Sequence, residues 1–181
     1  MLHRWLQFAP VIALLVWAAV IDLRERRIPN WLTGLLIFSG LGQSFLATHT
    51  VMPGDSVLGL LAAAAVPLVL FVLGAMGGGD VKLMAGLGTW MGPVPALLVL
   101  IVEKVLGLII VLTQAATEGR LRALFRNSVV LTANVLHVKD LGIENVARNG
   151  KRYQSVARPL PFAVPTLGAV IVVLSILGCS H

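Results

Sequence analysis

The feature that most constrains the fold of this chain is a set of long apolar runs with almost no charged residues. The run from Val57 to Met76 holds twenty residues, none of them charged. The hydrocarbon core of a bilayer is about 30 Å thick, and a helix needs roughly 20 apolar residues to cross it. Hydrophobic residues make up 57% of the 181-residue chain and charged residues only 12%, which argues against a soluble domain. The sequence therefore predicts an all-α membrane protein.

Runs of membrane-spanning length recur along the chain. The candidates are Trp5–Ile21, Trp31–Ala47, Val57–Met76, Val94–Ala116 and Phe162–Cys179. A sixth run, Val81–Met91, covers only about 16 Å as a helix, so it is either a half-helix beginning below the membrane surface or a re-entrant segment. The turn-forming residues 92–95 follow it. We therefore expect a single polytopic domain over residues 1–181, with about six transmembrane helices of which the fourth is short.

The basic residues are distributed unevenly between the two faces of this arrangement. Residues 22–30, 77–82 and 117–158 carry twelve of the fourteen Lys and Arg residues, and the three segments share a face if the short run crosses. Cytoplasmic loops are enriched in Lys and Arg, so we expect this face to be cytoplasmic and both termini to be outside. The net charge of +6 then reflects orientation, not nucleic-acid binding. Segment 117–158 is long enough for a cytoplasmic loop that contains an amphipathic helix lying on the surface.

Two aspartates stand at the ends of apolar runs on this face. Asp80 directly follows the glycines Gly77, Gly78 and Gly79, and Asp22 follows the first run. A carboxylate near bilayer depth costs about 2.5–3.5 kcal/mol on insertion scales, so such an acid usually has a function. Two neighbouring carboxylates share a proton, so one can act as general base on a water molecule while the other polarises a carbonyl group. We interpret the pair as the catalytic residues of an intramembrane aspartic protease, with glycines that let a substrate approach the backbone closely.

The sequence lacks the cysteine and histidine patterns that other catalytic chemistries require. The single cysteine, Cys179, permits neither an intrachain disulfide nor a paired-cysteine zinc site, and the four histidines are scattered without metal-ligand spacing. We therefore expect no metal and no cofactor.

Further residues near the aspartates are interpreted as supporting the site. Pro29 and Asn30 form a helix-start turn that positions Asp22. Lys82 either extends its amine to the membrane interface or favours the ionised form of a nearby carboxylate. Glu103 and Lys104 lie within a span, where each either finds a partner on another helix or in a water-filled crevice, or takes part in the active cleft.

The segments around the two aspartates carry recognisable motifs. Residues 22–30 read Asp-Leu-Arg-Glu-Arg-Arg-Ile-Pro-Asn, and residues 77–83 read Gly-Gly-Gly-Asp-Val-Lys-Leu. They resemble the type IV prepilin peptidases, Gly-x-Gly-Asp intramembrane aspartic proteases marked by an aspartate before an Ile-Pro-Asn turn and by a Gly-x-Gly-Asp-x-Lys-Leu element. Residues 86–92 and 160–165 are also similar to family segments. The chain looks most like the short branch that serves Flp/Tad-type pili, called CpaA or TadV.

The resemblance implies an activity and a location. Asp22 and Asp80 would be the catalytic aspartates of a prepilin leader peptidase in the cytoplasmic (inner) membrane of a prokaryote. Its partners would be a pilin precursor as substrate, membrane lipid and the pilus assembly machinery, with no nucleic acid. The long family members add an N-terminal region with paired cysteines and also methylate the new N-terminus. Nothing in this sequence corresponds to that region, so we expect no N-methyltransferase activity.

A function of another class uses the same charged residues. In a small multi-pass ion or proton-coupled transporter component, Asp22, Asp80, Glu103 and Lys104 would form the ion path, with the short broken helix as its site. The Ile-Pro-Asn turn and the lack of inverted repeats in the sequence favour the peptidase.

Overall fold

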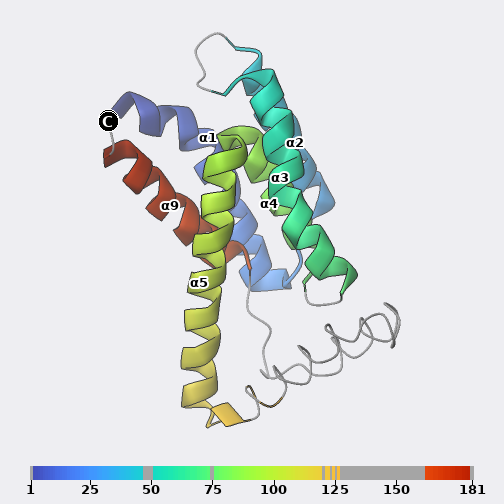
Figure 1. Ribbon diagram of the computed structural model, residues 1–181, viewed down its shortest axis with the longest axis vertical. Helices are drawn as coiled ribbons and strands as arrows, with labels where there is room; N and C mark the ends of the chain where they lie inside the picture. Colours follow the sequence, from blue (N-terminus) through green and yellow to red (C-terminus); the bar gives the residue numbers. More distant parts are fainter. Residues whose placement is uncertain are drawn as a thin grey trace.

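The computed structural model describes residues 2–46, 51–73, 76–119, 121, 122, 124, 126 and 162–179, and these residues form helices and short turns without a strand (Figure 1). The helices are α1 (Leu2–Glu25), α2 (Asn30–Ser44), α3 (Pro53–Val72), α4 (Gly78–Met91), α5 (Pro93–Thr117) and α9 (Ala163–Cys179). The predicted all-α class is confirmed. Most of segment 117–158, where we expected an amphipathic helix, lies outside the described residues.

Three helices of the described part are long and apolar enough to cross a membrane. They are Gln7–Glu25 within α1, the whole of α3 and the whole of α5, whereas α2, α4 and α9 have 15, 14 and 17 residues. Large apolar side chains face outward; Phe38 of α2, for example, is 75% exposed. An apolar exterior of this kind is expected of helices that meet lipid.

Some helix boundaries differ from those expected from the sequence. α1 continues to Glu25, so Asp22 lies in its last turn instead of after its end. The helix stops at Arg26, whose φ of 53° breaks the helical path. α3 begins at Pro53, four residues earlier than the apolar run, because proline suits the first turn of a helix. α4 begins at Gly78 instead of Val81, so Asp80 belongs to its first turn.

Successive helices from α1 to α5 run in alternating directions (Figure 1). The turn between α4 and α5 is a single residue, Gly92, whose φ of 76° favours glycine. As a result the α1–α2 turn, the start of α4 and the end of α5 all lie at one end of the molecule. We call it the lower end, after its place in Figure 1.

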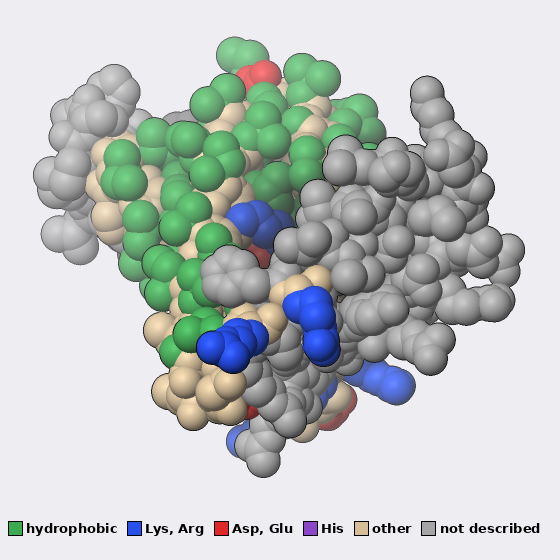
Figure 2. Space-filling model, turned by 60° about the horizontal axis from the view of Figure 1, so that its bottom comes forward, with side chains coloured by type: hydrophobic (Ala, Val, Ile, Leu, Met, Phe, Trp, Pro, Cys, Tyr) green, Lys and Arg blue, Asp and Glu red, His purple; other side chains and the backbone are tan. Residues whose placement is uncertain are grey.

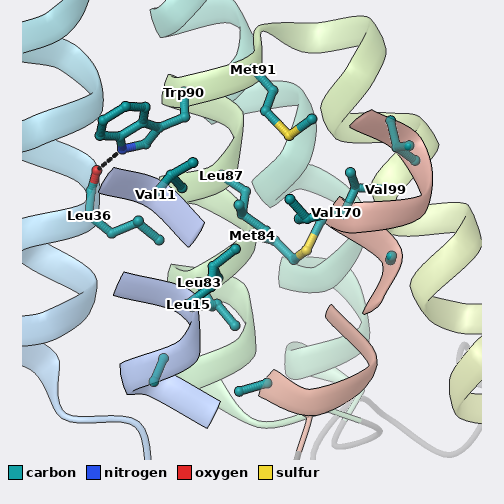
Figure 3. Packing of buried hydrophobic residues seen from close by; sticks show 14 of the residues in the cluster. Val11, Leu15, Leu36, Leu83, Met84, Leu87, Trp90, Met91, Val99 and Val170 are labelled. Atoms are coloured by element: carbon teal, nitrogen blue, oxygen red, sulfur yellow. Dashed lines mark hydrogen bonds between the residues drawn. The ribbon is translucent and has the colours of Figure 1, made fainter. Parts of the chain in front are cut away.

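α4 forms the centre of the fold, and its residues 83–91 are all buried. Leu83, Met84 and Leu87 point toward α1, α5 and α9, where they belong to one hydrophobic cluster with Leu15, Val99 and Val170 (Figure 3). On the side of α2, Trp90 donates its indole N–H to the Leu36 carbonyl oxygen at 3.0 Å. The helix that carries Asp80 is therefore held on all sides by other helices.

Small residues let α3 and α4 approach backbone to backbone. A Cβ atom built on Gly59 would collide with the carbonyl oxygen of Gly88, and one built on Gly88 would collide with that of Gly59. Such close approach through glycines is typical of helix pairs in membranes. Near the end of α4, Ser56 donates a hydrogen bond to the Thr89 carbonyl oxygen at 2.8 Å, which satisfies a carbonyl group that the helix itself leaves unpaired.

Candidate active site

Asp22 is held by the last helix. It lies in the final turn of α1, is 6% exposed, and accepts a hydrogen bond on Oδ2 from the backbone N–H of Ala163 at 3.0 Å. Ala163 is the first residue of α9, and the first N–H groups of a helix have no partner within it. The carboxyl group of Asp22 thus supplies the missing acceptor. It lies at the N-terminus of α9, and the N-terminus of a helix attracts negative charge.

Asp80 is held by its own helix. It is 7% exposed, and its Oδ2 accepts a hydrogen bond from the backbone N–H of Gly77 at 3.3 Å. Gly77 immediately precedes α4 and Asp80 is the third residue of the helix, the position at which an acidic side chain can reach back to the capping residue. Both aspartates therefore bind a backbone N–H at the start of a helix through one carboxyl oxygen. The other oxygen of each has no hydrogen bond to any described residue.

The two acids lie in the same charged cluster. The carboxyl group of Asp80 interacts electrostatically with Asp22, Lys104 and Glu103. These four residues come from α1, α4 and α5, and we call them the charged cluster. In Figure 2, where the lower end is turned toward the viewer, Lys and Arg side chains lie near acidic ones, and hydrophobic side chains cover the described surface above them.

The cluster lies part of the way along α5. Counted from the Gly92 turn at 1.5 Å per residue, Asp80 and Glu103 are each about 16–18 Å along their helices, so they are level with each other. α5 continues to Thr117, about 21 Å further. Along this stretch Leu108 and Ile109 stay more than half exposed, so the apolar surface of α5 continues below the charged cluster.

The glycines before Asp80 leave space for neighbouring groups, and their backbone angles are ordinary. None of the three has a positive φ. A Cβ on Gly77 would lie 3.2 Å from Asp80 Oδ2, one on Gly78 would lie 3.3 Å from the Phe71 ring, and one on Gly79 would lie 3.5 Å from Ile28. The absence of side chains here lets the start of α4 pack against the α1–α2 turn.

Asn30 and Lys82 join the two sequence motifs directly. Lys82 Nζ donates a hydrogen bond to Asn30 Oδ1 at 2.8 Å, and Pro29 caps the N-terminus of α2. This bond links the start of α4 to the start of α2. No hydrogen bond between described residues joins Pro29 or Asn30 to the Asp22 side chain, so the expectation that this turn positions Asp22 stays a prediction. The sequence reasoning missed Ala163 as the partner of Asp22, although the family-like segment 160–165 was a signal for it.

Glu103 and Lys104 pair with each other. Lys104 Nζ lies 3.0 Å from Glu103 Oε1, and the Glu103 side chain is 3% exposed. Their ion-pair partner therefore lies on the same helix and not on another one. Their electrostatic interaction with Asp80 agrees with the other alternative, a part in the active cleft, which stays a prediction.

Comparison with known proteins bears on this arrangement. A family model described as the type IV leader peptidase family matches residues 9–112, more than half of the chain. No curated protein and no solved structure matches the sequence. The matched range covers α1 to α5 almost completely and contains all four residues of the charged cluster, although α9, which binds Asp22, lies beyond it. Since the match spans most of the helical core and both motif-bearing aspartates, the chain belongs to the type IV leader peptidase family.

Proposed function

We propose that this protein is a prepilin leader peptidase whose catalytic residues are Asp22 and Asp80. Membership of the family supports a type IV prepilin leader peptidase. One observation carries the assignment of the two residues: both acids are buried in one charged cluster, each with one oxygen bound by a backbone N–H and the other without a bond to a described residue. This leaves one oxygen of each acid for water and substrate.

The proposed mechanism is that of a two-aspartate protease. The ionised aspartate takes a proton from a water molecule, whose oxygen attacks the carbonyl carbon of the scissile peptide bond. The protonated aspartate donates a hydrogen bond to the carbonyl oxygen. The C–N bond then breaks and the leaving nitrogen takes up a proton, which yields a carboxyl group and a free amine. Gly77 and Ala163 keep the two carboxyl groups oriented through this sequence.

We further propose that the substrate is the precursor of a Flp/Tad-type pilin, cut where its basic leader meets its apolar helix, without N-methylation of the product. The site would face the cytoplasmic side of the inner membrane. The basic residues near the lower end support this orientation, because Arg24, Arg26, Arg27 and Lys82 all belong to the segments there.

Co-expression with a pilin precursor tests this function. We expect a shorter pilin on a gel and a new, unmethylated N-terminus by mass spectrometry. The matched control is the same precursor expressed without the peptidase. An uncut precursor in membranes that contain the folded protein would contradict the proposal, and ion flux by the purified protein in liposomes would then favour the transporter alternative.

A second prediction concerns the position of the site in the membrane. In a Cys179→Ser background, which removes the only cysteine, we expect Gly78→Cys to react with a small membrane-impermeant thiol reagent from the cytoplasmic side. Gly78 is partly exposed at the start of α4, and hydrolysis requires that water reach this region. Labelling is measured by the mass shift of the intact protein in vesicles of each orientation.

Gly54→Cys is the matched control for this experiment. Gly54 is exposed near the start of α3, at the opposite end, and a Cβ there would meet no atom within 4 Å. We expect it to react only from the outside. Reaction of Gly78→Cys from the outside alone would overturn the orientation, and no reaction from either side would argue against hydrolysis at this site.

A further inference from the structure

Lys104 contacts both segments that supply backbone N–H groups to the aspartates. Its Nζ lies 3.9 Å from Met76 Sδ and 5.7 Å from the centroid of the Phe162 ring. Met76 directly precedes Gly77, and Phe162 directly precedes Ala163. One side chain on α5 therefore touches the residue before each of the two N–H donors.

Both contacts suit an ammonium group. A lysine within about 6 Å of an aromatic ring centre is attracted to the face of the ring. A thioether sulfur is polarisable and accepts weak hydrogen bonds. Lysine carries its charge on a flexible stem of four carbons, so it reaches two segments that lie far apart in the sequence. These contacts hold Met76 and Phe162 at a fixed separation from α5.

Glu103 fixes the direction in which Lys104 points. Its buried carboxyl group accepts the hydrogen bond from Lys104 on Oε1, while its Oε2 has no hydrogen-bond partner in the described part of the chain. A lysine on a membrane helix otherwise extends its amine toward the interface. Here the Lys104 side chain is 37% exposed and its amine is tied to a buried acid, so it stays within the charged cluster.

We propose that Lys104 is a positioning residue of the peptidase site, which holds Met76 and Phe162 and, through them, the N–H groups of Gly77 and Ala163 against the two aspartates. Glu103 holds Lys104 in place. Lys104 acts through its neighbours and does not touch the substrate. This inference rests on the proposed function, because the two aspartates are its catalytic residues.

The kinetic test uses Lys104→Met, which keeps the length of the side chain and removes its charge. We expect kcat for precursor cleavage to fall roughly 10–100-fold, the scale of a small misplacement of reacting groups, while KM stays unchanged because Lys104 does not bind the substrate. Lys104→Arg should restore kcat to within about threefold of wild type, since arginine also stacks on aromatic rings. Val105→Met, on the exposed face of the same helix, is the matched control and should cleave like wild type.

The Phe162 contact is tested separately. Phe162→Leu removes the ring and should lower kcat, whereas Phe162→Tyr keeps the ring and should not. The double variant Lys104→Met/Phe162→Leu should be no slower than Lys104→Met alone, because the two changes break one contact. Fully additive losses would show that Lys104 does not act through Phe162 and would overturn the proposal. The Phe162 variants also give an answer if Lys104→Met does not fold.

Thiol labelling gives a measurement that does not depend on peptidase activity. If Lys104 restrains the segment from Met76 to Gly78, Lys104→Met should make Gly78→Cys react several times faster, whereas Val105→Met should not. If Lys104→Met cleaves the precursor with the wild-type kcat and leaves the labelling rate of Gly78→Cys unchanged, the positioning role of Lys104 is overturned, while the proposed function still stands. Faster labelling in a protein that cleaves no precursor would contradict the proposed function and leave the restraint of the segment intact.

Discussion

Asp22→Asn and Asp80→Asn are each expected to abolish cleavage of a pilin precursor, with a loss of at least about 10²–10⁴-fold, the range for removal of a general acid or base. An amide can neither accept the proton of the attacking water nor give a proton to the carbonyl group. It can still accept the N–H of Ala163 or Gly77 through its oxygen, so the fold should persist. The measurement is the cleaved fraction of the precursor over time, at equal amounts of membrane-inserted enzyme.

Asp55→Asn is the matched control for this pair. Asp55 is an exposed acid in the first turn of α3, at the other end of the helix bundle. The same chemical change there should leave cleavage unchanged. Cleavage at a near wild-type rate by either Asp22→Asn or Asp80→Asn would remove that residue from the catalytic assignment.

Gly88→Ala is expected to destabilise the fold by about 1–3 kcal/mol or more, the cost of forcing an extra group into a packed interior. The added Cβ would meet the backbone of Gly59 on α3. Backbone atoms cannot rotate away as a side chain does, so the two helices must separate. Since α4 carries Asp80, cleavage should fall together with stability. Thermal unfolding in detergent measures the change.

Gly107→Ala provides the contrast within α5. A Cβ at Gly107 would meet no atom within 4 Å, and alanine favours a helix over glycine by about 1 kcal/mol. We expect this variant to be as stable as wild type or slightly more stable. Equal melting temperatures for Gly88→Ala and wild type would contradict the close packing of α3 and α4.

The sequence predicted the bounds of a helix best where a single physical requirement determines them. Apolar runs such as Val94–Ala116 predicted their helix to within one residue at each end, because membrane length and the prolines near its start define it. The start of α4 was less predictable. Glycines disfavour a helix interior, and only the bond between Asp80 and Gly77, together with packing against the α1–α2 turn, explains why α4 begins at Gly78.

The sequence predicted the two acids of the candidate site, but it did not predict the groups that bind them. Asp22 and Asp80 stand out because a charge near bilayer depth is costly. The N–H donor of Ala163 has no side-chain signature, since any residue other than proline carries this group. For Glu103 and Lys104 the sequence left two alternatives open, because their level relative to Asp80 depends on the Gly92 turn, which makes α4 and α5 antiparallel.

The bond between Asp22 and Ala163 has a consequence for the synthesis of the protein. The two residues are 141 positions apart, and a chain grows from its N-terminus at about 5–20 residues per second. Both aspartates therefore leave the ribosome several seconds before the segment that orients Asp22. A nascent chain that contains α1 to α5 carries both acids but lacks the N–H donor of Asp22, so the site is complete only after α9 has been synthesised and has packed against α1.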